Sequence, residues 1–317
     1  MLDNDIGSAA DRSRMKRRFR KSVFVVPSLF TTANIFCGFY SIMESLSGAQ
    51  ALSLGDVASA AEHFDRAAIN IGFAFLFDGL DGRIARMTGA TTEFGLELDS
   101  IADVLSFGIA PALLAFTWGY GEAAQLHKVA WMVSFLFVIC GALRLARFNV
   151  QARKPSPNLP SKSLAADKKA FVGMPIPVGA SLIAAIVHFK PTPLYHIEAF
   201  EPEIFGRTFR IDGSAFAILL LVLVAFLAFL MVSTIRYASF KGMGARNYHP
   251  RILILGLALC VVTVWFYSRW ALLIFSTFYA SHGLVIKLWS LAGWKKRGPT
   301  RRSRVEMDGE AHKSNRV

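Results

Sequence analysis

Residues 78–86 read Asp78-Gly79-Leu80-Asp81-Gly82-Arg83-Ile84-Ala85-Arg86, and Gly95, Asp99 and Asp103 follow after eight, three and three intervening residues. On a helix, Asp78 and Asp81 would be three positions apart and Asp99 and Asp103 four. Each pair would then share one face, with Cβ atoms about 5–6 Å apart. Two such pairs facing each other would offer the oxygen-rich coordination that hard divalent cations prefer. We therefore expect a metal and phosphate site on two neighbouring helices.

The chain around this stretch has the composition of a membrane protein. Its 317 residues are 54% hydrophobic and 13% aromatic, with a mean hydropathy of +0.42, too apolar for an ordinary soluble domain. Most of the apolar segments are near the ~20 residues that cross a bilayer, and none shows the alternation of a membrane barrel. We therefore expect an all-α polytopic bundle of about eight transmembrane helices. The segments are 23–45, 67–88, 97–120, 128–149, 172–190, 213–235, 251–268 and 270–290.

The basic residues predict the orientation of these spans. Basic runs precede the first span and follow the last, and Lys and Arg are present in 150–170 and 236–251 but absent from 46–64 and 121–127. By the positive-inside rule, both termini and the aspartate stretch face the cytoplasm, with Met87 to Phe94 as the turn between the second and third spans. The first apolar segment is too long for a signal peptide and is expected to remain as a span of the inner membrane.

The predicted spans and their orientation divide the chain into four regions. Residues 1–22 form a basic cytoplasmic tail, 23–190 the catalytic core, 191–290 additional transmembrane helices, and 291–317 a basic tail expected to be disordered. The net charge of +13 could suggest nucleic-acid binding. The basic residues lie beside membrane spans, however, and the aromatic residues lie within them. We therefore expect anionic lipid headgroups as partners and no nucleic acid.

The aspartate stretch matches every specified position of the CDP-alcohol phosphotransferase signature, D-x2-D-G-x2-A-R-x8-G-x3-D-x3-D. Four further blocks resemble the membrane-bound phosphatidylserine synthase branch of that family. They begin at Val26-Pro27, Ser106-Phe107-Gly108, Leu143-Arg144 and Phe171-Val172-Gly173. Together the blocks span roughly residues 22 to 180. The resemblance implies a CDP-alcohol phosphotransferase fold, two divalent ions, Mg²⁺ or Mn²⁺, and a homodimer.

The resemblance also assigns roles within the stretch. It makes Asp78, Asp81 and Asp99 the metal ligands and Asp103 the general base, which must stay free enough of metal to accept a proton. Gly82 and Ala85 lack bulk, so that a nucleotide can approach the backbone, and Arg86 would bind the diphosphate. Gly95 is included with them as a contact of CDP-diacylglycerol. The alternative is that the aspartates lie in an interfacial turn and are either solvated or paired with Arg83 and Arg86. This alternative explains neither the spacing nor Gly82, Ala85 and Gly95.

Two interpretations remain open for each of the other polar residues. Arg144 and Arg147 lie three apart at the end of the fourth span, where they could bind the carboxylate of serine or only anchor the span at the membrane surface. Thr31 and Asn34 occupy positions that in the family lie near the nucleotide, although polar packing between helices would explain them equally well.

The implied reaction is direct displacement at the lipid-bearing phosphate of CDP-diacylglycerol by the hydroxyl of L-serine, with release of CMP. A sister enzyme that uses glycerol 3-phosphate, inositol phosphate or choline is the first alternative. A non-catalytic transporter or lipid-binding protein is the second. A transporter would be expected to carry charged residues near mid-membrane and duplicated broken helices, whereas here the polar cluster is single and interfacial.

Overall fold

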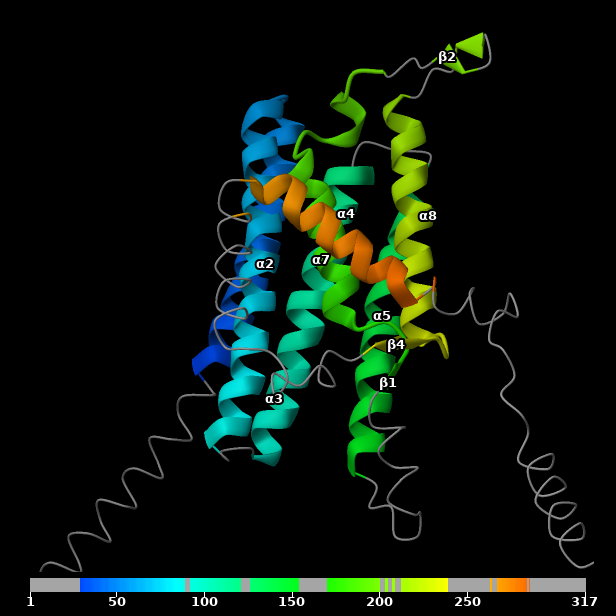
Figure 1. Cartoon of the computed structure of the whole chain (residues 1–317). Coiled ribbons are helices and arrows are strands. Elements are labelled where there is room, and N and C mark those ends of the chain that lie inside the picture. Colours follow the sequence, from blue (N-terminus) through cyan, green and yellow to red (C-terminus); the bar gives the residue numbers. More distant parts are fainter. Residues whose placement is uncertain are drawn as a thin grey trace, which may run out of the picture.

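The structure is a computed structural model that describes residues 29–88, 92–120, 126–153, 170–199, 203–204, 207–208, 212–238, 263, 267–283 and 285. These residues form a bundle of long helices (Figure 1). A helix at 29–53 comes first, and another at 267–283 comes last. Between them are α2 (Val57–Thr88), α3 (Glu93–Asp103), η1 (Val104–Ile109), α4 (Ala110–Ala115), η2 (Phe116–Tyr120), α5 (His127–Arg153), α7 (Ile176–Phe189), η3 (Leu194–His196) and α8 (Gly213–Val232).

The membrane character of the bundle is confirmed, but the expected number of spans is not. Within the described ranges, three continuous helical segments are long and apolar enough to cross a bilayer: Glu93–Tyr120, His127–Val150 and Gly213–Val232. The span expected at 172–190 is the 14-residue α7. At 1.5 Å per residue it is about 21 Å long, less than the ~30 Å hydrocarbon core. Most of the expected span at 251–268 and both basic tails lie outside the described residues.

The expected loop at 46–64 is in fact mostly helical. The helix at 29–53 and α2 are joined only by residues 54–56. Gly55 adopts a φ of 79°, which a glycine tolerates without steric cost, and the Asp56 carboxylate accepts a hydrogen bond of 3.0 Å from the backbone N–H of Ser59. Hydropathy predicts which part of a helix lies in lipid, whereas Gly55 and Asp56 determine where the two helices end and begin. Both helices therefore run past their apolar segments.

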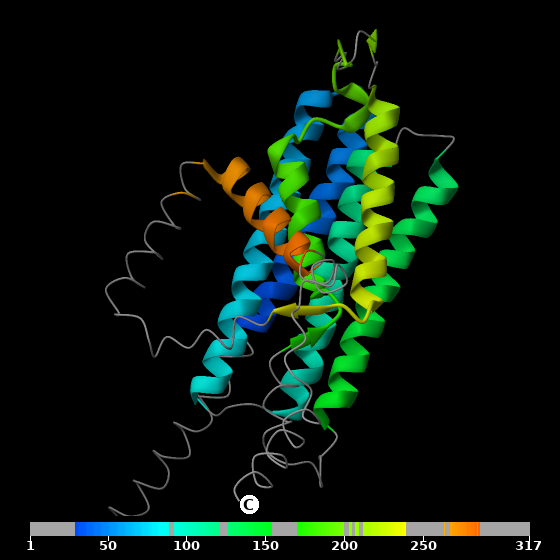
Figure 2. The same ribbon diagram turned by 45° about the vertical axis from the view of Figure 1, so that its right-hand side comes forward.

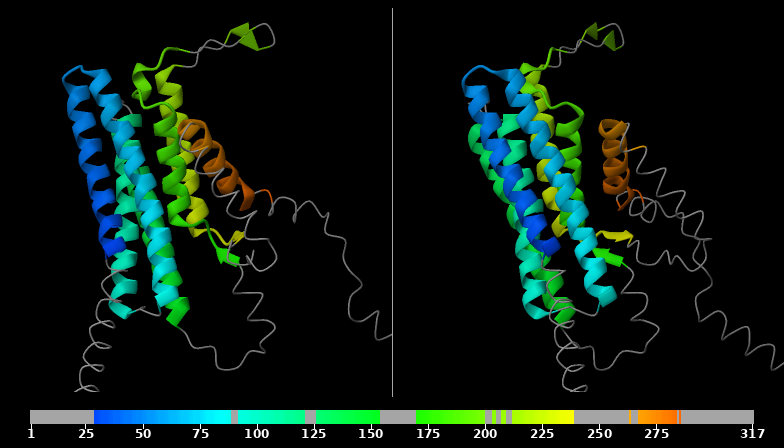
Figure 3. Two further views of the ribbon diagram at one scale, coloured as in Figure 1. Left: turned by 60° about the vertical axis from the view of Figure 1, so that its left-hand side comes forward. Right: turned by 90° about the vertical axis from the view of Figure 1, so that its left-hand side faces the viewer.

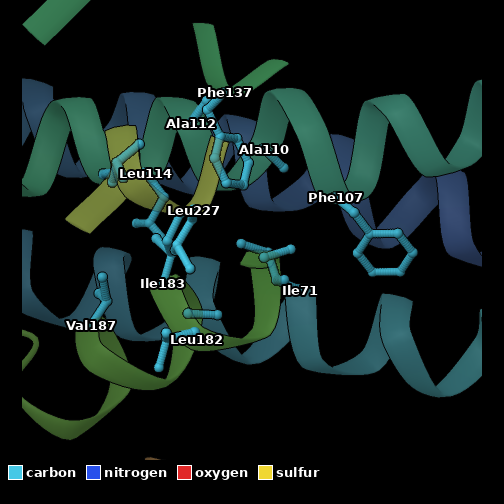
Figure 4. Close-up of a cluster of buried hydrophobic side chains, with 14 of the residues drawn as sticks. Ile71, Phe107, Ala110, Ala112, Leu114, Phe137, Leu182, Ile183, Val187 and Leu227 are labelled. Carbon is cyan, nitrogen blue, oxygen red and sulfur yellow. The ribbon is translucent and has the colours of Figure 1, made fainter. Parts of the chain in front are cut away.

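The helices pack around a common apolar core. In that core α7 packs against α2, and α8 packs against α5 (Figure 2). Ile71, Leu114, Ile183 and Leu227 come from four different helices and meet in the buried cluster of Figure 4. Many large apolar side chains remain on the outside of the bundle, which is the pattern expected of a surface that faces lipid.

Two short antiparallel strand pairs are additions to the expected all-α class. β1 (Ala170–Val172) pairs with β4 (Arg236–Ala238), and β2 (Glu203–Ile204) pairs with β3 (Arg207–Thr208). The first pair joins the chain before α7 to the chain after α8. Beside it, Gly173 has a φ of 83°, and its N–H donates a 2.9 Å hydrogen bond to the Ile235 carbonyl. A Cβ at this glycine would collide with the backbone oxygen of Met231.

The third expected span changes its helical pitch directly after Asp103. Residues Val104–Ile109 form a π-helical segment between α3 and α4. Pro111 has no N–H, so the Phe107 carbonyl loses its ordinary helical partner, and the proline ring crowds that carbonyl. The wider π turn accommodates this loss. Such turns are frequent at functional sites, because they change the direction in which neighbouring side chains point.

Candidate active site

Three of the four aspartates converge. α2 and α3 lie side by side at one end of the bundle (Figure 1). Asp78 of α2 lies beside Asp99 and Asp103 of α3, and each offers a carboxylate oxygen within 4.8 Å of the others. α2 ends at Thr88 and α3 begins at Glu93, and the two helices bring residues separated by more than 20 positions face to face. The spacing of the aspartates predicted this convergence.

Asp81 is turned toward a different helix. It is buried, and its carboxylate accepts a hydrogen bond from the hydroxyl of Thr31 on the helix at 29–53. The carboxylate group that could hold an ion therefore contains Asp103 where the resemblance assigned Asp81. Asp81 still lies close enough to act electrostatically on Asp78, Asp99 and Asp103. The division of roles among the four aspartates thus stays a prediction.

The residues present suit a divalent cation. Three partly buried carboxylates within 4.8 Å of one another repel strongly when ionised. Among the described side chains, no ion pair reaches any of the four aspartates. Arg83 is exposed, and the side chain of Arg86 is outside what the structure describes. The alternative arrangement, in which these arginines pair with the aspartates, is not observed in the described part of the site.

Arg144 of α5 comes closest to meeting this negative charge. It is partly buried and interacts electrostatically with Asp103, but the two form no direct ion pair. Buried polar atoms of both residues, Oδ1 of Asp103 and Nε of Arg144, have no hydrogen-bond partner. Arg147, three residues further along α5, has an exposed side chain. The structure therefore separates two arginines that the sequence left equivalent.

The residues predicted to contact the nucleotide differ in what the structure shows of them. Gly82 is partly buried, one residue beyond Asp81, while the side chains of Ala85 and Arg86 lie outside the described part of α2. Gly95 has a local role: its N–H donates a 3.0 Å hydrogen bond to Thr92 Oγ1, which caps α3. A Cβ at this position would sit 3.0 Å from the same oxygen. The glycine therefore also allows the tight start of the helix that carries Asp99.

Asn34 is fully buried one helical turn beyond Thr31, and its side-chain amide has no hydrogen-bond partner. Its backbone carbonyl accepts a 3.0 Å hydrogen bond from Ser106 Oγ in the π-helical segment. Gly38 makes this contact possible, because a Cβ there would collide with Ser106. The small residues thus draw the helix at 29–53 against the helix that carries Asp103.

Sequence reasoning missed one residue near this site. Tyr279, on the helix at 267–283, is half-buried against the core and interacts electrostatically with Arg144. It lies about 100 residues beyond the last quoted block, so no short-range spacing could have connected it with Arg144. Ser106 was quoted within a block, but only the structure reveals its hydrogen bond.

Comparison with known proteins identifies the family of the chain. Residues 24–204, more than half of the chain, match the model of the CDP-alcohol phosphatidyltransferase family, and this range contains all four aspartates and Arg144. The chain belongs to this family. It is 33% identical over 264 residues to a CDP-diacylglycerol–serine O-phosphatidyltransferase of Helicobacter pylori, covering 83% of this chain and 91% of that protein.

Two other relatives of this family member come from distant organisms. An archaetidylserine synthase of Methanothermobacter thermautotrophicus is 33% identical over 226 residues, which cover 71% of this chain and 74% of that protein. A CDP-diacylglycerol–serine O-phosphatidyltransferase of Saccharomyces cerevisiae is 36% identical over 158 residues, which cover 50% and 51%. All three relatives carry serine in their names.

Proposed function

We propose that the protein transfers the phosphatidyl group of CDP-diacylglycerol to the hydroxyl of L-serine and releases CMP. The observation that carries the proposal is the similarity to the Helicobacter pylori enzyme, which extends over 91% of that enzyme. The converging carboxylates supply a site suited to this chemistry, since phosphoryl transfer depends on positioning and on stabilising charge.

In this mechanism Asp78, Asp81 and Asp99 would hold two divalent ions, Mg²⁺ or Mn²⁺. Bound there, the cations would neutralise charge that develops on the diphosphate oxygens. Thr31 fixes the Asp81 carboxylate through its hydrogen bond, and Arg86 binds the diphosphate. Gly82, Ala85 and Asn34 contact the nucleotide, and Gly95 keeps the start of α3 compact beside it.

Asp103 is the general base in the proposal. It accepts the proton of the serine hydroxyl as that oxygen forms its bond to the lipid-bearing phosphorus, and the bond from phosphorus to the CMP oxygen breaks. Arg144 receives the serine carboxylate, because a guanidinium binds a carboxylate in a bidentate manner. Its electrostatic interaction with Asp103 supports a position for the acceptor beside the base.

A sister enzyme with another acceptor is the second candidate. Glycerol 3-phosphate or inositol phosphate would bring a dianion, which needs a denser basic cluster than one partly buried arginine. The name of the archaetidylserine synthase also favours serine, because it names a different lipid group from the other two relatives and still names serine.

The test is an assay of purified protein with CDP-diacylglycerol and labelled L-serine, glycerol 3-phosphate, inositol phosphate or choline. We expect CMP release and lipid labelling with L-serine, in the presence of Mg²⁺ or Mn²⁺ and not with excess chelator. Preferential incorporation of another alcohol would overturn the serine assignment and leave the transferase chemistry standing. Full activity in excess chelator would overturn the metal assignment.

The acceptor site is tested by Arg144→Ala, with Arg147→Ala as its matched control. Loss of a hydrogen-bonded charge pair raises the apparent KM for serine about ten- to hundredfold, with a much smaller effect on the KM for CDP-diacylglycerol. Arg147→Ala should have the smaller effect, because its side chain is exposed. Equal effects of the two variants on serine would contradict this assignment of Arg144.

We further propose an inner-membrane location with the site and both termini on the cytoplasmic side. The basic tails there would contact anionic lipid headgroups. The family resemblance supports a homodimer.

A further inference from the structure

A hydrogen bond joins α3 and α5 beside the aspartates. Asn149 Nδ2 of α5 donates to Ser100 Oγ of α3 at 2.8 Å, and Ser100 Oγ lies 3.0 Å from the Leu96 carbonyl within its own helix. A serine hydroxyl has a single proton, which here goes to the Leu96 carbonyl. Ser100 must therefore accept from Asn149, and this requirement fixes the orientation of the Asn149 amide.

This bond lies next to the Asp103–Arg144 pair. The chain rises through α3 and returns through α5, so the two helices are antiparallel (Figure 3). Asp103 is three residues beyond Ser100, about 4.5 Å along its helix, and Arg144 is five residues before Asn149, about 7.5 Å along the other. Both steps lead in the same direction. The Ser100–Asn149 hydrogen bond therefore lies about one helical turn from the place where Asp103 and Arg144 interact electrostatically between the same two helices.

We propose that Asn149 is a positioning residue for the acceptor. By holding Ser100, it fixes the register of α5 against α3, and thereby the position of Arg144 relative to Asp103. The proposal rests on the proposed function, since it takes Arg144 as the residue that binds the acceptor. Misplacing a reacting group by about 1 Å can cost about a hundredfold in rate, so the loss of the single Ser100–Asn149 hydrogen bond is enough to lower the rate measurably.

A double-mutant cycle tests the proposal. Asn149→Ala, Ser100→Ala and the double variant are compared for kcat and for the KM of each substrate. We expect each single variant to lower kcat/KM for serine about tenfold or more, as loss of a partner that orients an active-site group does. The double variant should be no worse than either single one, because all three remove the same link. The KM for CDP-diacylglycerol should change less than twofold.

Two control variants lose a similar bond that stays within one helix. Asn70 Nδ2 donates to the Arg66 carbonyl at 2.8 Å in α2, and Ser181 Oγ donates to the Val178 carbonyl at 3.0 Å in α7. Asn70→Ala and Ser181→Ala should keep wild-type kinetics. Thermal unfolding midpoints of all the variants separate a change of register from general destabilisation.

Three results would overturn the role of Asn149. Wild-type kinetics of Asn149→Ala would show that the link is dispensable. Additive losses in the double variant would indicate that Asn149 contacts the acceptor directly. If kcat/KM of the Asn149→Ala variant fell equally for both substrates and its unfolding midpoint also fell, Asn149 would have only a structural role. Failure of the proposed function is distinguishable, because the wild-type protein would then not turn over serine, and the cycle can be run with the acceptor that it does use.

Discussion

Asp103 is set apart from the other three aspartates by its electrostatic interaction with Arg144. It is the only one of the four aspartates that the structure places both within the converging carboxylates and in electrostatic contact with Arg144, among the residues described. Its Oδ1 atom is buried without a partner, whereas Asp81 is held by Thr31. A carboxylate oxygen that no neighbour occupies is suited to accept a proton from an incoming hydroxyl.

Asp103→Asn should therefore abolish turnover, by about a hundredfold or more, because an amide cannot accept the hydroxyl proton. Binding of CDP-diacylglycerol, measured by titration of the purified variant, should remain near that of the wild type. Asp56→Asn is the matched control: asparagine caps a helix as well as aspartate does, so it should leave both quantities unchanged. Substantial turnover by a folded Asp103→Asn protein would remove Asp103 from the role of base.

The sequence predicted that aspartates of two helices would meet, because the aspartate pairs follow helical periodicity, although Asp81 does not join the other three. Asp78, Asp99 and Asp103 meet as their spacing indicated. The Thr31–Asp81 bond, the Asn149–Ser100 bond and the electrostatic interaction of Tyr279 with Arg144 join residues on different helices that are about 50 or more positions apart in the sequence. Such pairings depend on how helices pack, and a single sequence carries no periodic signal for them.

Among the elements, the helix at 267–283 is attached to the bundle by a polar network. His188 of α7 lies between two partners, with Nδ1 2.6 Å from Asp65 of α2 and Nε2 2.9 Å from Ser268. Phe189 and Trp270 add an edge-to-face ring contact at 4.7 Å between centroids. The Asp–His–Ser order resembles that of a hydrolase triad, but here it joins three different helices. Asp65 is 13 residues, or about 20 Å along α2, from Asp78.

His188→Ala should destabilise the protein without altering its chemistry. The change leaves Asp65 and Ser268 without their partner, which costs about 1–3 kcal/mol, or roughly 2–10 °C in the unfolding midpoint for a protein of this size. Serine turnover at a temperature well below that midpoint should stay near wild type. His282→Ala removes a histidine from the same helix outside the network and should leave the midpoint unchanged. A loss of kcat with an unchanged midpoint would contradict the structural role.

Element type was easier to predict than element length. The apolar segments predicted α5 and α8 closely, because lipid exposure requires nearly continuous apolar sequence. They overestimated the length of α7. An apolar run that is buried within the bundle need not span the membrane, and Gly173 and Pro175 place the start of the helix at Ile176. They missed β1 and β4, because three-residue strands have too few positions to show a period of two.

At the scale of the whole molecule, apolar surface and charge are arranged for a membrane. Large side chains such as Phe36, Trp131 and Phe229 are more than half exposed, although they come from different helices of the bundle. The basic residues are concentrated outside the apolar segments, in the two tails and in two connections. Lipid would cover the apolar surface, and the basic residues predict which end of the bundle faces the cytoplasm.

The orientation predicts which positions a membrane-impermeant thiol reagent can reach in intact cells. Gln50 lies at the end of the bundle whose connection lacks basic residues, and Glu93 begins α3 at the opposite end; both side chains are exposed. With Cys37, Cys140 and Cys260 replaced by serine, Gln50→Cys should be labelled in cells whose outer membrane has been made permeable, and Glu93→Cys should not. Both should be labelled after lysis, which serves as the control for reactivity. Labelling of Glu93→Cys alone before lysis would invert the topology and place the aspartates on the side away from the cytosolic serine and nucleotide pools.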